Sequence, residues 1–123
     1  MSTKLTLLFK TLFFISLAAI STLAFLPDYN ALPPIVSFSD LLNHTVAFVV
    51  LFILGHFAYP SILLKHLTTA LILYAFFIEA VQYFLPTRFA SWSDISADIV
   101  GLVIAYITIN LFRHLSYAHN PDS

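Results

Sequence analysis

Three pairs of polar residues interrupt an otherwise apolar chain, and each pair has a spacing that places both members on one face of a helix. The pairs are Asp40 and His44, Glu79 and Gln82, and Asp94 and Asp98. Side chains three or four positions apart are neighbours on a helix surface. Carboxylate and amide groups bind ligands through hydrogen bonds, and a carboxylate beside an imidazole can also move protons. The spacing therefore indicates a polar binding site or an acid–base site.

The composition makes such groups unusual. Of the 123 residues, 60% are hydrophobic and only 9% are charged, whereas soluble domains carry roughly 25% charged residues. A small domain cannot bury that many Phe and Leu side chains, so the chain is predicted to be an integral membrane protein. An ionisable side chain inside a bilayer costs about 2.5–3.5 kcal/mol on insertion scales. The polar pairs therefore need partners or a function.

Composition also excludes several classes of protein. The net charge is −1 without a basic cluster, so we expect no nucleic-acid partner. The chain has no cysteine, which excludes disulfides, thiolate metal sites and a thiol nucleophile. We assign no cofactor and no metal ligands from the sequence.

Four apolar runs predict four membrane-spanning helices, over residues 5–26, 40–59, 62–85 and 94–115. Each run is long enough to cross a hydrocarbon core, and prolines in the connections stop the helices. The predicted fold is an all-α, four-helix membrane bundle that forms a single domain over residues 1–123. The first run also resembles a signal peptide, with a basic start and small residues near Ala24. We favour a retained helix, because the rest of the chain is itself membrane-embedded.

The positive charges predict the orientation. Lys4, Lys10, Lys65 and Arg113 lie on one side of the predicted bundle and Arg88 alone on the other. Cytoplasmic loops carry the excess of Lys and Arg, so we predict that both termini are cytoplasmic. The expected localisation is the inner (cytoplasmic) membrane, as a multi-pass protein.

The polar groups share one depth in this topology. At a rise of about 1.5 Å per residue, His44 and Asp98 lie about 6 Å and Glu79 about 9 Å below the outer helix ends. Polar faces at one level are most cheaply buried against each other. We therefore predict one pocket, open to the extracytoplasmic side, with Arg88 at its rim. The candidate ligand-binding residues are His44, Glu79, Gln82, Arg88, Asp94 and Asp98.

Simpler roles exist for some of these residues. Asp94 can be a helix N-terminal residue, and His44 can be a hydrogen-bonded packing residue. Arg88 can contact lipid headgroups. Glu79 and Asp98 are the hardest to dismiss, because neither has a charged or capping partner on its own helix.

The order of these motifs resembles the VanZ-like family of membrane proteins. The patterns are D-x-x-x-H, E-x-x-Q-x-x-x-P-x-R and D-x-x-x-[ND]-x-x-G, carried here by Asp40, His44, Glu79, Gln82, Pro86, Arg88, Asp94, Asp98 and Gly101. The family is named for an accessory protein linked to glycopeptide (teicoplanin) resistance. The resemblance implies a role in the bacterial envelope, with cell-wall precursors or lipid carriers as partners.

The chain departs from the family pattern at three positions. Leu41 stands where the family usually has Lys, Asp98 where it usually has Asn, and Ala105 where it commonly has Gly. The expected pocket is therefore more acidic than the family pattern, which favours a bound cation or a protonated carboxyl.

Three functions fit the sequence. In a binding module, His44 and Arg88 engage an anionic lipid or precursor headgroup, while Glu79, Asp94 and Asp98 shape the pocket. In a membrane enzyme, His44 and a carboxylate form an acid–base pair on a lipid-linked substrate, and a divalent ion on His44 and the three carboxylates is chemically allowed. In a structural accessory subunit, the polar groups only lock the helices together. We favour the first function, and leave catalysis and oligomeric state open.

Overall fold

The computed structural model describes residues 2–25, 40–85 and 92–119, with the backbone alone for residues 40 and 117–119. These ranges hold the helices α1 (Thr3–Ala24), α3 (Asp40–Ala58), α4 (Leu64–Tyr83) and α5 (Trp92–His119). All four are long and apolar enough to cross a membrane, as expected for segments whose backbone must satisfy its own hydrogen bonds in lipid. The predicted all-α, four-helix architecture is confirmed.

The helix ends differ slightly from the predicted ones. α4 begins at Leu64 instead of residue 62, because the chain makes a turn in which the Ile62 amide donates to the Tyr59 carbonyl at 3.1 Å. α5 runs from Trp92 to His119 instead of 94–115. Its helical hydrogen bonds continue past Arg113, since a helix need not end where its apolar stretch ends.

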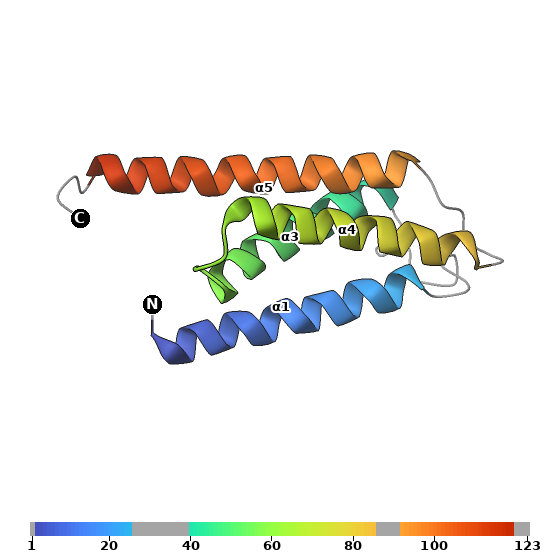
Figure 1. Ribbon diagram of the computed structural model, residues 1–123, viewed down its shortest axis with the longest axis horizontal. Helices are drawn as coiled ribbons and strands as arrows, with labels where there is room; N and C mark the ends of the chain where they lie inside the picture. The colour runs from blue at the N-terminus through green and yellow to red at the C-terminus, as the bar shows by residue number, and fades with distance from the viewer. Residues whose placement is uncertain (1, 26–39, 86–91, 120–123) are drawn as a thin grey trace.

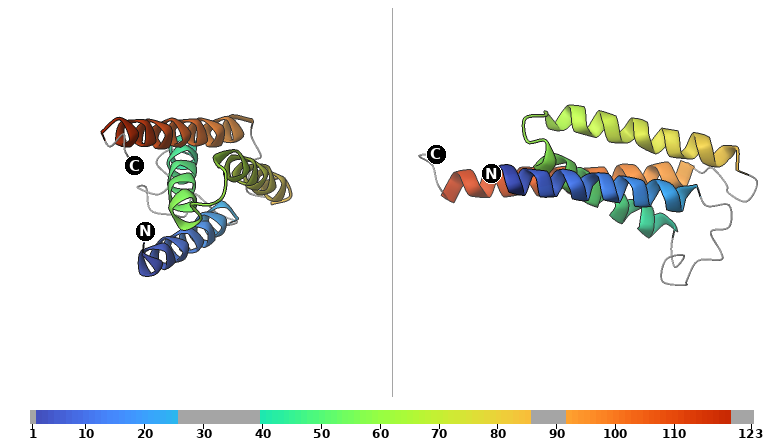
Figure 2. Two further views of the ribbon diagram at one scale, coloured as in Figure 1. Left: turned by 60° about the vertical axis from the view of Figure 1, so that its left-hand side comes forward. Right: turned by 90° about the horizontal axis from the view of Figure 1, so that it is seen from below.

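The helix α3 is the centre of the bundle. It lies between α1 and α5, with α4 packed alongside (Figures 1 and 2). The buried core contains large side chains from α3 and α4, of which Phe48, Leu51, Phe52 and Ile78 are almost fully inaccessible. Many Leu, Ile, Val and Phe side chains are exposed on the outside, which fits a bundle surrounded by lipid.

A row of small residues lets α3 and α5 approach closely. Ala97, Gly101 and Ala105 follow one another at four-residue spacing on α5, and all three are buried. A Cβ added to Gly101 would lie only 2.4 Å from the backbone oxygen of Thr45 on α3. Small residues at this spacing are a common basis of tight helix contacts in membranes, and they hold the starts of α3 and α5 together.

α1 packs against α3 and α4. Phe13, Leu17 and Ile20 lie against the hydrophobic core, and the Ser21 hydroxyl is hydrogen-bonded to the Tyr74 hydroxyl on α4. The first apolar run thus forms a helix that belongs to the bundle.

The start of α1 and the end of α5 lie at the same end of the bundle (Figure 1). The opposite end, here called the polar end, holds the end of α1, the start of α3, the end of α4 and the start of α5. If all four helices cross the membrane, both termini face the same side, as the predicted topology requires. Which side that is stays a prediction from the distribution of Lys and Arg.

Candidate functional site

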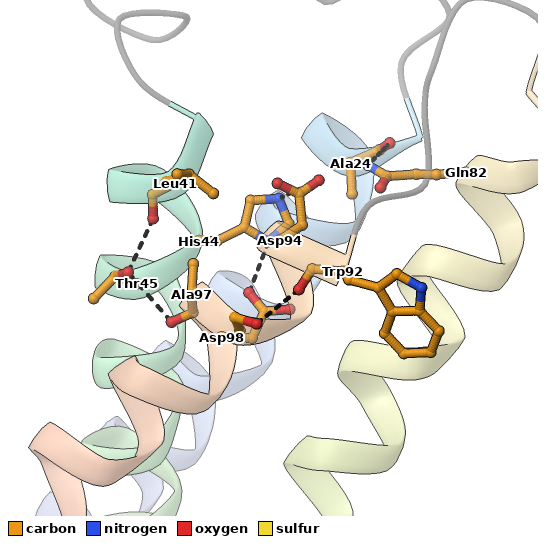
Figure 3. A network of polar contacts seen from close by, with 10 residues as sticks. Ala24, Leu41, His44, Thr45, Gln82, Trp92, Asp94, Ala97 and Asp98 are labelled. Carbon is orange, nitrogen blue, oxygen red and sulfur yellow. Dashed lines mark hydrogen bonds and ion pairs between the residues drawn. The ribbon is translucent and has the colours of Figure 1, made fainter.

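Three helices contribute polar side chains to the polar end. His44 lies in the second turn of α3, Asp94 and Asp98 in the first two turns of α5, and Glu79 near the end of α4. Because α3 and α5 begin at the end of the bundle where α4 ends (Figure 1), residues far apart in the sequence come together there. Figure 3 shows His44, Asp94 and Asp98 at this end.

His44 and Asp98 form a direct hydrogen bond. Nδ1 of His44 lies 2.7 Å from Oδ1 of Asp98, whose side chain is fully buried. An ionised carboxylate can only accept a hydrogen bond, so Nδ1 carries the proton when Asp98 is ionised. The other ring nitrogen, Nε2, lies 3.8 Å from Asp94 Oδ2. The bond holds the imidazole in one orientation and, with Asp98 ionised, in one tautomer.

His44, Glu79 and Asp94 form a compact set of donors. Each residue offers one nitrogen or oxygen atom, and these atoms lie within 4.8 Å of one another. Glu79 is buried, whereas the His44 and Asp94 side chains each keep 15% of their surface exposed. We call these three residues with Asp98 the acid–imidazole cluster.

Gln82 faces a different neighbour. Its side chain is buried, and Nε2 donates to the Ala24 carbonyl at 2.9 Å. The last carbonyls of a helix have no partner within the helix, so this bond completes the end of α1 and ties it to α4 (Figure 3). The observed contact is structural, and a role for Gln82 in ligand binding stays a prediction.

Two predicted positions cannot be placed in this site. Arg88, the expected rim cation, and Pro86 lie outside the described residues, and for Asp40 only the backbone is described. The structure therefore brings together His44, Glu79, Asp94 and Asp98 from the sequence-predicted set.

Some buried oxygen atoms at the polar end have no hydrogen-bond partner. In the part of the chain that the structure describes, these include Oδ2 of Asp98 and Oε1 of Gln82. Leaving a buried polar atom unsatisfied costs about 1–3 kcal/mol, and such atoms in native proteins usually bind water, an ion or a ligand. The acid–imidazole cluster thus has unused acceptor capacity.

Sequence reasoning missed Thr45. Its hydroxyl donates to the Leu41 carbonyl at 2.9 Å and approaches the Ala97 carbonyl on α5 at 3.2 Å. This contact lies beside the His44–Asp98 bond and holds the two helices in register. The signal that could have found it is the small-residue row at 97, 101 and 105, which predicts a close helix contact but not its partner.

Comparison with known proteins gives one match. The family model VanZ/LLP1 matches residues 2–113, nearly the whole chain. No curated protein and no solved structure matches significantly.

Proposed function

The chain belongs to the VanZ/LLP1 family, and we propose that it binds the headgroup of an anionic membrane lipid or lipid-linked envelope precursor at its acid–imidazole cluster. Its four apolar helices make it a multi-pass membrane protein. The proposal rests above all on one observation: polar side chains from three apolar helices converge at one end of the bundle. If the four helices cross the membrane, this end of the bundle lies at the depth of the lipid headgroups.

The chemistry of the cluster supports recognition of a headgroup. Asp94 and Glu79 accept hydrogen bonds from hydroxyl or amino groups, and His44 supplies an imidazole that is held in place by Asp98. A phosphate also needs a positive charge. Arg88, which follows α4 in the sequence, is the cation that we expect to provide it.

The charge distribution supports an extracytoplasmic site. Lys4, Lys10, Lys65 and Arg113 all belong to the half of the bundle that carries the termini (Figure 1). By the positive-inside rule this half faces the cytoplasm, which leaves the polar end in the outer leaflet of the inner membrane. Lipid carriers present cell-wall precursors in that leaflet, so binding there would alter glycopeptide susceptibility.

Lipid binding by the purified protein tests the proposal. The full chain in nanodiscs is expected to enrich anionic lipid or a lipid-linked precursor over phosphatidylcholine, as measured by native mass spectrometry. His44→Gln should abolish the enrichment. The matched control is His66→Gln, since His66 is exposed in the first turn of α4, at the opposite end. Equal enrichment by wild type and H44Q would contradict the proposal.

A membrane enzyme is the second candidate, favoured by the His44–Asp98 geometry. A carboxylate that holds Nδ1 leaves Nε2 as the proton acceptor, which is the arrangement of a general base. In this version Nε2 removes a proton from water or a hydroxyl of a lipid-linked substrate. Conversion of such a substrate by the wild type, lost in H44Q and retained in H66Q, would establish the enzyme over the binding module.

A further inference from the structure

We propose that His44, Glu79 and Asp94 bind a divalent transition-metal cation of the Zn²⁺ class, and that Asp98 orients His44 for this purpose. The inference goes beyond headgroup binding and does not require it, because the ligands all belong to the protein.

The positions of the donor atoms support a shared ion. Nitrogen and oxygen ligands lie about 2.0–2.2 Å from Zn²⁺. The donor atoms of His44, Glu79 and Asp94 lie within 4.8 Å of one another, so small side-chain rotations bring all three onto one ion. They come from α3, α4 and α5, which are all in contact with one another.

The His44–Asp98 bond is an independent argument. With its proton on Nδ1, a neutral imidazole has only a lone pair on Nε2. That lone pair faces Asp94 Oδ2 at 3.8 Å. Two acceptors that face each other are stabilised by a donor or a positive charge between them, such as a water, a proton on His44 or a metal ion, and the negative charge of the cluster favours the cation. Metal-binding histidines characteristically donate their second nitrogen to a carboxylate, as His44 does to Asp98.

The burial of Asp98 is a second observation that points to a bound cation. The residue is completely buried, and among the described atoms its Oδ2 has no hydrogen-bond partner although Oδ1 binds His44. A buried carboxylate with an unsatisfied oxygen favours a nearby cation. Asp98 therefore contributes negative charge behind the imidazole and raises its strength as a ligand.

The donor set selects the class of metal. One imidazole and two carboxylates suit Zn²⁺ or Mn²⁺, whereas Ca²⁺ and Mg²⁺ prefer oxygen ligands alone. Three protein ligands leave a coordination position for water or another oxygen. If the proposed function also holds, that position would accept a headgroup phosphate oxygen, and the metal would supply positive charge among the acidic side chains.

Metal titration of the intact protein tests the site. The full chain, solubilised in detergent and stripped with a chelator, is titrated with Zn²⁺ by calorimetry and with Co²⁺ by visible absorption. We expect one ion per chain and a Co²⁺ spectrum typical of mixed nitrogen and oxygen ligands. H44Q and Glu79→Gln should lose saturable binding, and H66Q should bind as the wild type does. Asp98→Asn should weaken binding by about 10–100-fold without abolishing it.

A variant that is expected to fold distinguishes loss of the metal site from misfolding. Asp94 is partly exposed in the first turn of α5, so Asp94→Asn should fold. Zn²⁺ should raise the unfolding temperature of the wild type and not of D94N. Absence of saturable Zn²⁺ binding by the wild type, or unchanged binding in both H44Q and D94N, would overturn the metal site and leave a protonated His44 as the explanation.

The two proposals fail separately. Headgroup enrichment that persists in a chelator, together with no Zn²⁺ binding in detergent, would reject the metal and keep the lipid site. Stoichiometric Zn²⁺ binding without enrichment of any anionic lipid would support the metal and reject the headgroup.

Discussion

Nδ1 of His44 on α3 lies 2.7 Å from Oδ1 of Asp98 on α5, and the carboxylate is completely buried. The bond joins residues 54 positions apart and lies beside the close approach of α3 and α5 at Thr45 and Gly101. The same contact therefore has two consequences. It stabilises the polar end, and it holds Nε2 of His44 at 3.8 Å from Asp94 Oδ2.

Removing the carboxylate of Asp98 should destabilise the bundle. A buried hydrogen bond to a charged group typically contributes about 1.5–3 kcal/mol, so Asp98→Ala should lower the free energy of unfolding by about that amount. Asp98→Asn keeps an oxygen that can accept from Nδ1 and should cost clearly less. Chemical unfolding in detergent, followed by circular dichroism, measures both. Equal stability of wild type and D98A would mean that the bond contributes nothing.

A side chain at Gly101 should separate α3 from α5. The added Cβ of Gly101→Ala would lie 2.4 Å from the Thr45 carbonyl oxygen, which is backbone and cannot rotate away. We expect a loss of about 1–3 kcal/mol in unfolding free energy, the usual cost of overpacking, with weaker ligand binding by His44.

Gly55→Ala is the matched control for this substitution. Its Cβ would meet side chains, with Leu67 Cδ1 at 3.0 Å and Phe13 Cε2 at 3.1 Å. Because side chains can move, G55A should cost less than G101A and leave ligand binding unchanged. A larger effect of G55A would show that the α3–α5 approach is not the sensitive contact.

The hydroxyl pair of Ser21 and Tyr74 should couple α1 to α4. Each of Ser21→Ala and Tyr74→Phe should lower the unfolding free energy by about 0.5–1.5 kcal/mol, the net worth of a hydrogen bond. The double variant should lose less than the sum, since one bond is shared. Strict additivity in thermal or chemical unfolding would argue against this contact between α1 and α4.

Replacing Glu79 by Gln should distinguish a structural role of this side chain from a role in ligand binding. The amide has the shape of the carboxylate but lacks its charge, so Glu79→Gln should fold and lose metal and headgroup binding. Lower stability in a folded protein whose ligand binding and glycopeptide susceptibility are unchanged would favour the structural accessory subunit instead.

The orientation can be measured with single cysteines, because the chain has none of its own. Trp92 lies at the polar end, and Ser61 is exposed in the turn between α3 and α4. A membrane-impermeant maleimide should label Trp92→Cys in spheroplasts, and should label Ser61→Cys only after the membrane is opened. The reverse pattern would place the acid–imidazole cluster on the cytoplasmic side.

The sequence alone predicts the helices, the shared depth of the polar residues and the family. Apolar runs of this length must form helices, because lipid offers no partner for a free backbone group. Glu79 and Asp98 stand out within such runs, because a charge in lipid needs a partner. Their positions along the helices place them at one depth, and the motif order around them indicates the family.

Only the tertiary structure decided which atoms meet. In a soluble helix the apolar face identifies the core, but here lipid and core are equally apolar, so hydropathy does not distinguish the faces of a helix. The sequence therefore grouped Gln82 with the binding residues, although it binds the Ala24 carbonyl. It also left open whether His44 would meet Glu79 or Asp98. The close approach of Thr45 and Gly101 decided that question, because it sets His44 and Asp98 within hydrogen-bonding distance.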